Sequence, residues 1–369
     1  MSALLLVASC GNNGSSTATT NTIQDTTKTN ENNMTSTSTD LKPALPKPAW
    51  GKDMTDQMAV VIEKLTSFNA PSLVGLSAVE ARKQPTPADA AIGVIKDHNI
   101  QMPPNNVDTM GKEIPVAGGS IHLRIYTPNT NKASYPVIVY YHGGGWVIAD
   151  LDTYHASALG LANSTEAVVV SVAYRQAPEH KFPTAHNDCY AAYEWAVKNA
   201  ASIKGDPKKI ALVGESAGGN LAAAVSMMAR DKGLQAPVHE VLVYPIAGYD
   251  FTTTSYMESE STKPLGSGLM KWFFEKYLTG EKDGKNPWID LVHANLKGMP
   301  STTIIGAQYD PLRSEGQTLA DNFKKAGVNT NYKLYNGVTH EFFGMAAIVP
   351  EAKQAQDFAT AELKNVFGN

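Results

Sequence analysis

Short runs of apolar residues recur along this chain, and segments of helical length separate them. The runs are rich in valine and isoleucine and cover residues 136–141, 167–172, 210–213, 241–244, 303–309 and 332–335. Helical composition occupies residues 185–201, 216–232 and 315–326. Continuous apolar strands are covered on both faces, and strand-helix alternation gives a mainly parallel sheet flanked by helices. The sequence therefore predicts an α/β fold, with its chemistry at the carboxyl ends of the strands.

Two segments interrupt this alternation. Residues 51–100 begin with apolar side chains at helical spacing, such as Met58, Val61 and Leu65. Residues 247–296 insert loops rich in glycine, serine and threonine around an aromatic helix at 272–274. Residues 121–126 alternate like a half-buried strand that follows a Gly118-Gly119 turn. We expect one domain over residues 51–369, with a helical cap formed by 51–100 and 247–296.

The first fifty residues have a different character. Residues 1–10 are uncharged, mostly apolar and end at Cys10, a pattern similar to a bacterial lipoprotein signal, although no Lys or Arg precedes the apolar run. Residues 11–50 are rich in serine, threonine and asparagine, a composition typical of a disordered tether. We expect an exported protein that is anchored to a bacterial membrane through acylated Cys10. The alternative is a disordered N-terminus with an incidental cysteine on a cytoplasmic protein.

Composition excludes several classes of function. The formal net charge of −4 provides no electrostatic footprint for nucleic acid. The two cysteines, Cys10 and Cys189, do not suggest a disulfide framework, and no zinc-type spacing of Cys and His occurs. No apolar stretch approaches the roughly 18 residues that a membrane-spanning helix needs. We expect neither a metal nor an organic cofactor.

A G-x-S-x-G sequence lies where a strand passes into a helix. Gly214-Glu-Ser-Ala-Gly218 follows the apolar run at 210–213 and opens the helical segment at 216–232. In this context the motif forms a tight turn that holds the serine in strained geometry with its hydroxyl exposed. Ser216 is therefore the predicted nucleophile.

Three consecutive glycines follow the first central strand, in His142-Gly-Gly-Gly-Trp146. Glycines let backbone N–H groups turn toward an anion without obstruction. We predict an oxyanion hole formed by the N–H groups of Gly144, Gly145 and Ala217. His142 is expected to orient the loop.

A serine nucleophile needs a base and a carboxylate that orients the base. Asp310 follows the run at 303–309, and His340 follows the run at 332–335 after a short link. The sequence therefore predicts a triad of Ser216, Asp310 and His340 at one edge of the sheet.

Other polar residues receive structural interpretations. We expect His293 to face solvent or the cap, Glu341 to be an exposed charge, and Cys189 to be a small buried hydrophobe. Trp146 and Glu215 are expected to contact substrate, although Glu215 alternatively braces neighbouring loops. The remaining candidates of this kind, all expected to be structural, are His180, His186 and Asp188.

The two glycine motifs resemble those of the hormone-sensitive-lipase-like esterases, also called bacterial family IV, within the α/β-hydrolase superfamily. Residues 174–183, 310–313 and 76–82 are similar to further segments of that family, and the likeness covers roughly residues 51–369. The resemblance implies that Ser216 is the nucleophile, His340 the base and then the acid, and Asp310 its orienting carboxylate. It also implies oxyanion donors at Gly144, Gly145 and Ala217. Ser314 departs from the pattern, because the family commonly has Asp there.

The implied activity is hydrolysis of short- to medium-chain acyl esters of small molecules through an acyl-enzyme, without a cofactor. One alternative is an acetyl-esterase acting on acetylated carbohydrate or on a small-molecule amide. From a different class come a non-catalytic ligand-binding protein and a surface interaction module. Members of the family often form homodimers through an edge strand, which makes a homodimer possible here too.

Overall fold

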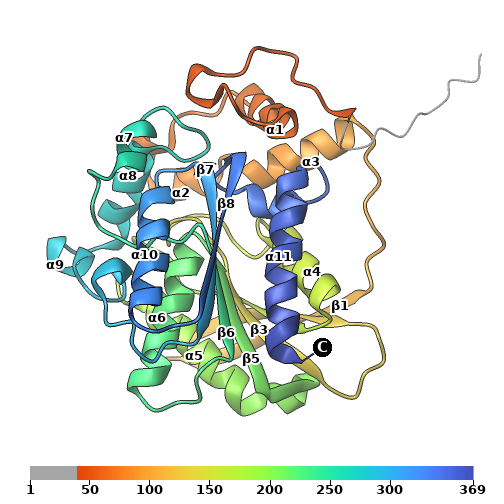
Figure 1. Ribbon diagram of the computed structural model, residues 1–369, viewed down its shortest axis with the longest axis vertical. Helices are drawn as coiled ribbons and strands as arrows, with labels where there is room; N and C mark the ends of the chain where they lie inside the picture. Colours follow the sequence, from red (N-terminus) through yellow and green to blue (C-terminus); the bar gives the residue numbers. More distant parts are fainter. Residues whose placement is uncertain (1–39, 369) are drawn as a thin grey trace, which may run out of the picture. The chain divides into compact units, whose positions relative to one another are not determined.

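The computed structural model describes residues 40–368, so Cys10 and residues 11–39 of the expected tether lie outside the described residues. Its core is one eight-stranded sheet in the order β1-β2-β4-β3-β5-β6-β7-β8 (Figure 1). The strands are β1 (Val107–Val116), β2 (Gly119–Pro128), β3 (Tyr135–Tyr141), β4 (Val168–Ala173), β5 (Gly205–Glu215), β6 (His239–Val243), β7 (Ser301–Tyr309) and β8 (Thr330–Thr339).

The six strands from β4 to β8 in this order pair in parallel, whereas β1 and β2 are antiparallel to their neighbours. The expected α/β fold with a mainly parallel sheet is therefore confirmed. Strand β1 was not predicted from the sequence. Six consecutive residues of β1 are exposed at this edge of the sheet, so neither apolar continuity nor alternation marks it.

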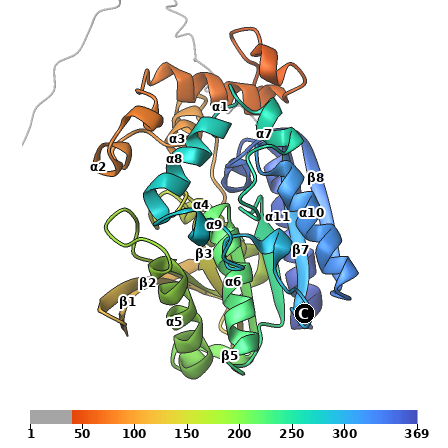
Figure 2. The same ribbon diagram turned by 90° about the vertical axis from the view of Figure 1, so that its left-hand side faces the viewer.

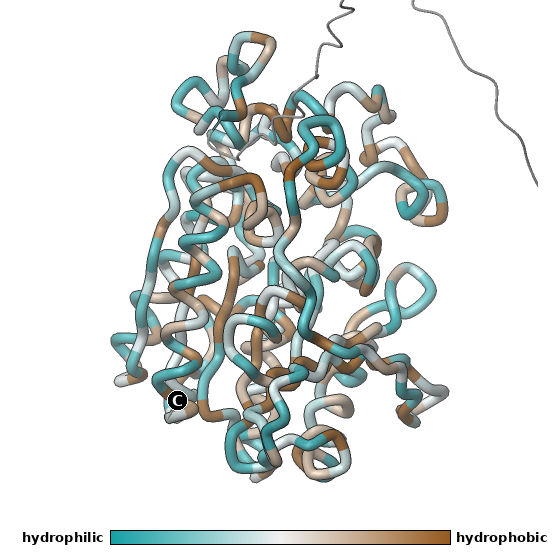
Figure 3. The backbone as a smooth tube through the Cα atoms, turned by 90° about the vertical axis from the view of Figure 1, so that its right-hand side faces the viewer, coloured by the Kyte–Doolittle hydropathy of each residue, from teal (hydrophilic) through white to brown (hydrophobic). Residues whose placement is uncertain are grey.

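Helices cover both faces of the sheet (Figure 1). On one face lie α4 (His155–Thr165) and α11 (Pro350–Phe367), and on the other lie α5 (Thr184–Asn199), α6 (Ala217–Asp231) and α10 (Arg313–Lys325). Strand β3 is buried throughout, and its side chains alternate between two apolar clusters: Val137 and Val139 pack toward α5 and α6, whereas Ile138 packs toward α4 and α11. Figure 3 shows hydrophobic stretches along the interior strands and hydrophilic ones on the outer turns.

Further helices gather beyond the carboxyl ends of the parallel strands (Figure 2). These are α1 (Asp56–Ser67), α2 (Ala78–Ala81), α3 (Pro87–Asp97), α7 (Thr254–Glu258) and α8 (Ser267–Tyr277). Capping boxes start two of them, because Ser77 pairs with Glu80 and Thr86 with Asp89. The remaining elements are α9 (Glu281–Gly284) and the 3-10 helices Ala49–Gly51, Leu73–Gly75, Ala200–Ile203, Leu291–His293 and Phe342–Met345.

The folded body begins before residue 51, which corrects the carboxyl-terminal boundary expected for the tether. Leu41 is only 1% exposed, and the ammonium groups of Lys42 and Lys47 each lie 2.7 Å from the Asp56 carboxylate. The Trp50 ring contacts Tyr309 edge-on. The composition of residues 41–50 predicts a tether, but Leu41 is buried and Trp50 is half-buried against the body. None of the helices within residues 40–368 has the length and apolar character needed to span a membrane.

Candidate active site

Ser216 stands between β5 and α6 in a conformation that few non-glycine residues adopt. Its φ is 57° and its ψ is −117°. The turn is so tight that a side chain at Gly214 would overlap the carbonyl of Gly218. Glycine is therefore required on the strand side of the turn, as the G-x-S-x-G motif predicts. The strain fixes the serine at the amino terminus of α6, at the edge of the sheet where the expected partners lie.

The structure brings the three predicted triad residues together. Nε2 of His340 lies 2.9 Å from Oγ of Ser216, and Nδ1 lies 2.7 Å from Oδ2 of Asp310. Asp310 directly follows β7, and its other oxygen accepts a hydrogen bond of 2.8 Å from the N–H of Leu312. All three triad side chains are buried. One imidazole thus connects a hydroxyl to an oriented carboxylate.

Neighbouring charges set the protonation of this imidazole. Burial by itself lowers the pKa of His340, but the carboxylates of Asp310, Glu341 and Glu215 outweigh burial and raise the pKa above its ordinary value. The positive charge that a proton brings to His340 is therefore stabilised at this site.

The glycine loop after β3 lies beside Ser216. Gly144 and Gly145 both have positive φ, at 98° and 58°, and within residues 40–368 no acceptor pairs with either N–H group. The N–H of Ala217 belongs to the first turn of α6, where helices leave their amide donors without intrahelical partners. Together these groups offer unpaired donors next to the Ser216 hydroxyl.

Two side chains fix the shape of that loop. A side chain at Gly145 would overlap the ring of Phe273, and one at Gly143 would overlap the hydroxyl of Tyr154.

His142 stacks on Tyr174 with ring centroids 4.3 Å apart. Burial lowers the pKa of His142 to about 4, so this imidazole is neutral near pH 7. Its Nδ1 lies 2.8 Å from the Gly143 carbonyl, an arrangement that matches the expected orienting role.

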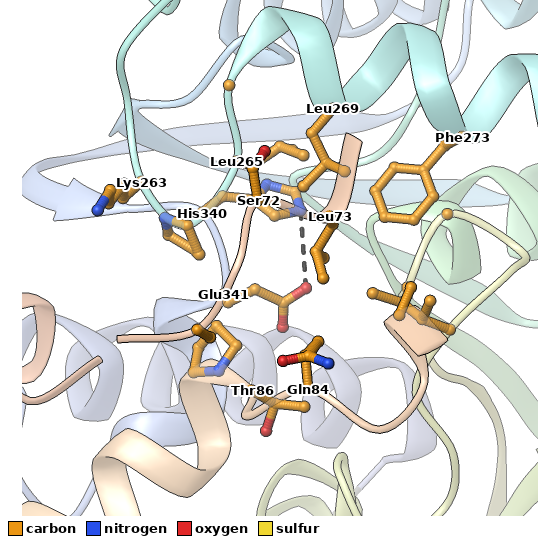
Figure 4. A pocket seen from close by; sticks show the side chains of 18 of the residues that line it. Ser72, Leu73, Gln84, Thr86, Lys263, Leu265, Leu269, Phe273, His340 and Glu341 are labelled. Carbon is orange, nitrogen blue, oxygen red and sulfur yellow. Dashed lines mark ion pairs between the residues drawn. The ribbon is translucent and has the colours of Figure 1, made fainter. Parts of the chain in front are cut away.

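A pocket of about 590 Å³ opens over Ser216 and His340. Both interrupting segments line it, through residues 65–87 from the first and 260–273 from the second. Figure 4 shows Leu73, Leu265, Leu269 and Phe273 directed toward its interior. The pocket therefore has an apolar wall, and one member of that wall, Phe273, lies against Gly145 of the oxyanion loop.

Trp146 and Glu215 do not contact this pocket, which corrects the expectation that they bind substrate. Trp146 is fully buried and stacks on Tyr277 with ring centroids 4.5 Å apart. The hydroxyls of Tyr140 and Tyr244 each donate to the Glu215 carboxylate at 2.5 Å. Burial, the larger cause, and the charge of Glu341 together raise the pKa of Glu215 to about 7. Glu215 thus matches its alternative interpretation, because it braces β3 and the end of β6.

Glu341 is not the exposed charge that the sequence suggested. Its φ of 70° turns the side chain back into the pocket, where the side chain is only 19% exposed (Figure 4). The hydroxyl of Tyr154 donates to Oε1 of Glu341 at 2.6 Å, and the same oxygen lies 3.8 Å from Nε2 of His340. Burial raises the pKa of Glu341, whereas His340 and the Tyr154 hydroxyl act in the opposite direction. The left-handed turn after His340 has no sequence signal, because glutamate rarely adopts it.

The other candidates lie apart from the pocket. His293 is exposed and pairs with Asp290, and His180 is also exposed. Asp188 is buried and binds the Arg175 guanidinium. The remaining two, both fully buried, are His186, whose pKa burial lowers to about 4, and Cys189, whose thiol pKa burial raises.

Ser314, which departs from the family pattern, exchanges hydrogen bonds with Ser255 of α7. The N–H of Ser255 donates to its hydroxyl at 3.1 Å, and its own N–H donates to the Ser255 hydroxyl at 3.0 Å. The residue at this position therefore joins the cap to the loop that carries Asp310. In the part of the chain that the structure describes, no cluster of three or more His, Cys, Asp or Glu side chains has a metal-binding arrangement.

Comparison with known proteins identifies relatives that match about two thirds of this chain. The family described as the alpha/beta hydrolase fold matches residues 138–344. The carboxylesterase NlhH of Mycobacterium tuberculosis is 36% identical over 251 residues, which are 67% of this chain and 79% of the relative. An arylesterase of Saccharolobus solfataricus is 35% identical over 262 residues, or 70% of this chain and 84% of the relative.

Solved structures with a similar fold are also those of esterases. A thermostable esterase from Pseudomonas putida ECU1011 superposes with a TM-score of 0.77 at 31% identity. The superposition covers 84% of this chain and 97% of the esterase chain. An esterase from Pyrobaculum calidifontis superposes with a TM-score of 0.74 at 36% identity, and the superposition covers 82% of this chain and 97% of the esterase chain.

Proposed function

The chain belongs to the α/β-hydrolase fold family, among the hormone-sensitive-lipase-like esterases, and from this membership we propose that it is a serine carboxylesterase acting on short- to medium-chain acyl esters. The observation that carries the serine mechanism is the position of one imidazole, since His340 contacts Ser216 through Nε2 and Asp310 through Nδ1. This arrangement is the one that activates a hydroxyl for acyl transfer.

The reaction proceeds in two halves. Oγ of Ser216 attacks the ester carbonyl carbon while its proton passes to Nε2 of His340, and collapse of the tetrahedral intermediate breaks the bond to the alcohol oxygen. His340 returns the proton to that oxygen, and the alcohol leaves. A water molecule then gives its proton to His340, attacks the acyl-enzyme and releases the acid as Ser216 recovers a proton. Asp310 stays ionised and stabilises the imidazolium in both halves.

The oxyanion of each tetrahedral intermediate faces the N–H groups of Gly144, Gly145 and Ala217. Fixed donors of this kind are already oriented before charge develops, so they stabilise the transition state more than the ester. Loss of one such donor typically costs about 3 to 4 kcal/mol of barrier.

The apolar wall supports the chain-length proposal. Each methylene buried against Leu265, Leu269 or Phe273 is worth roughly 0.8 kcal/mol, so affinity grows with the acyl chain until the pocket is full. A volume of about 590 Å³ is in the ordinary range for a small-molecule site and accommodates an ester of short to medium chain.

Hydrolysis of p-nitrophenyl esters tests the proposal. The purified protein should hydrolyse p-nitrophenyl butyrate and react with a fluorophosphonate probe, whereas the Ser216→Ala variant should do neither. A series of acyl chains from two to twelve carbons should show an optimum in the lower half. A folded wild-type protein that is inert to both the esters and the probe would contradict the serine mechanism.

A further inference from the structure

Glu341 places a carboxylate in the pocket beside the reacting groups. Nε2 of His340 is its near neighbour, at 3.8 Å from Oε1, and the same Nε2 contacts the Ser216 hydroxyl at 2.9 Å. The carboxylate is held there, because the Tyr154 hydroxyl donates to it at 2.6 Å and the left-handed turn at Glu341 directs the side chain inward. In Figure 4 it lies between His340 on one side and Gln84 and Thr86 on the other.

No basic side chain neutralises this carboxylate. Within residues 40–368, Glu341 forms an ion pair with His340 but with no lysine or arginine. Two basic side chains, an arginine and a lysine, line the pocket. Arg82 is occupied by the Glu179 carboxylate and by the carbonyls of Val147 and Ala177, and Lys263 is exposed and forms no ion pair with Glu341 among the described residues. The negative charge of Glu341 therefore acts on whatever occupies the pocket next to His340.

The mechanism determines which half of the ester, the acyl group or the alcohol group, lies next to Glu341. Nε2 of His340 must deliver its proton to the departing alcohol oxygen, so the alcohol group lies on the His340 side of the scissile bond. The carbonyl oxygen points instead to the loop of Gly144 and Gly145. Glu341 stands beside Nε2 and consequently lies next to the alcohol group.

We propose that Glu341 is a specificity-determining residue that makes the esterase prefer esters whose alcohol carries a positive charge, such as an ammonium group, and disfavour esters of anionic alcohols. The inference rests on the proposed serine esterase function and adds the charge of the alcohol to it. A partly buried carboxylate attracts a cation across a few ångströms far more strongly than it would in water, and it repels an anion to a similar degree. Neutral alcohols are accepted without either effect.

Three butyrate esters test this directly. Butyrylcholine carries a quaternary ammonium, 3,3-dimethylbutyl butyrate is its neutral isostere, and 3-(butyryloxy)propionate carries an anion. In the wild-type protein, kcat/KM should fall in that order. In Glu341→Gln the ratio for the cationic over the neutral ester should drop about ten-fold, and the anionic ester should gain. Both esters of a ratio share the acyl group and His340, so a change in the pKa of His340 cancels from it.

The Glu113→Gln variant is the matched control. It removes the same charge from an exposed position on β1, away from the pocket, and should leave both ratios unchanged. Retained hydrolysis of the neutral ester by Glu341→Gln shows that this variant folds. Equal ratios in the wild-type protein and Glu341→Gln would overturn the inference, as would a wild-type preference for the anionic ester. A wild-type protein inert to all three esters and to p-nitrophenyl butyrate would instead overturn the esterase proposal.

Discussion

Oε1 of Glu341 lies 3.8 Å from Nε2 of His340, while Asp310 contacts the opposite nitrogen at 2.7 Å. The imidazole therefore has an acidic neighbour at each of its two nitrogens. The Asp310 carboxylate orients the ring, and the Glu341 carboxylate lies in the pocket over Ser216. This relationship bears on pH dependence as well as on the choice of substrate.

The Glu341→Gln substitution should move the acid limb of the pH profile to lower pH. A carboxylate stabilises imidazolium, so its removal lowers the pKa of His340. Only neutral His340 accepts the Ser216 proton, and the variant should keep that form to a lower pH, by about half a unit to one unit. The other groups that face the ring, Asp310, Glu215 and Tyr244, are unchanged. The measurement is kcat/KM for p-nitrophenyl butyrate against pH. An unmoved limb would mean that Glu341 does not act on the imidazole.

A side chain at Gly145 in the oxyanion loop should strongly reduce activity, and removal of the neighbouring Phe273 ring should restore part of that activity. In Gly145→Ala the new methyl group overlaps the Phe273 ring, so the loop is expected to shift from its position beside Ser216. We expect kcat to fall by about two to three orders of magnitude, the usual cost of a misplaced oxyanion donor. The double variant Gly145→Ala with Phe273→Ala removes the obstruction and should recover at least ten-fold. Phe273→Ala alone serves as the control, and a double variant no better than Gly145→Ala would show that backbone strain, rather than the ring, causes the loss.

Glu240 should make the protein less stable as pH rises. Burial raises the pKa of this carboxyl to about 7, although the hydroxyls of Ser226 and Thr302 contact it at 2.6 and 2.9 Å. In the unfolded chain the group ionises at its ordinary pKa, so the free energy of unfolding falls from that pH upward and levels off above the folded pKa.

The Glu240→Gln variant removes this dependence. The variant's free energy of unfolding minus that of the wild-type protein should be larger at pH 8 than at pH 4.5, by up to about 3 kcal/mol, because only the wild-type protein loses stability over that range. Urea unfolding at the two pH values measures the difference. Glu215, which behaves similarly, is present in both proteins and does not enter the comparison. A difference that is the same at both pH values would contradict the prediction.

The sequence of residues 1–10 predicts a lipoprotein whose signal is removed and whose Cys10 is acylated. If Cys10 is cleaved and acylated, globomycin should block its maturation, and treated cells should yield a heavier protein than untreated cells. In a Cys10→Ala variant the drug should have no effect. One identical mass for the wild-type protein under both conditions would reject the signal.

The residues that meet at the site were predictable because each directly follows a strand. Ser216, Asp310 and His340 come after β5, β7 and β8, and the carboxyl ends of parallel strands lie at one edge. The apolar runs identified those strands, since complete burial leaves a continuous hydrophobic signal. The glycine motifs added the turn and the oxyanion loop.

What the sequence did not reveal depends on side-chain direction. Glu341 was expected to be exposed, because nothing in the chain announces the left-handed turn that sends it into the pocket. Trp146 follows the glycine loop, yet its ring turns into the core and stacks on Tyr277. Strand β1 escaped prediction because its exposed residues lack a periodic pattern, and it is defined by pairing with β2. Residues 41–50 resembled a spacer, although Leu41 and Trp50 are held by contacts with distant segments.

The overlap that a side chain at Gly143 would make with Tyr154 gives the first glycine of the loop a purpose different from that of its two neighbours. The Tyr154 hydroxyl reaches Glu341 only because Gly143 has no side chain. Positions 143 and 341 are thus coupled through Tyr154: a side chain at position 143 would displace the hydroxyl that holds the acid at position 341 in the pocket.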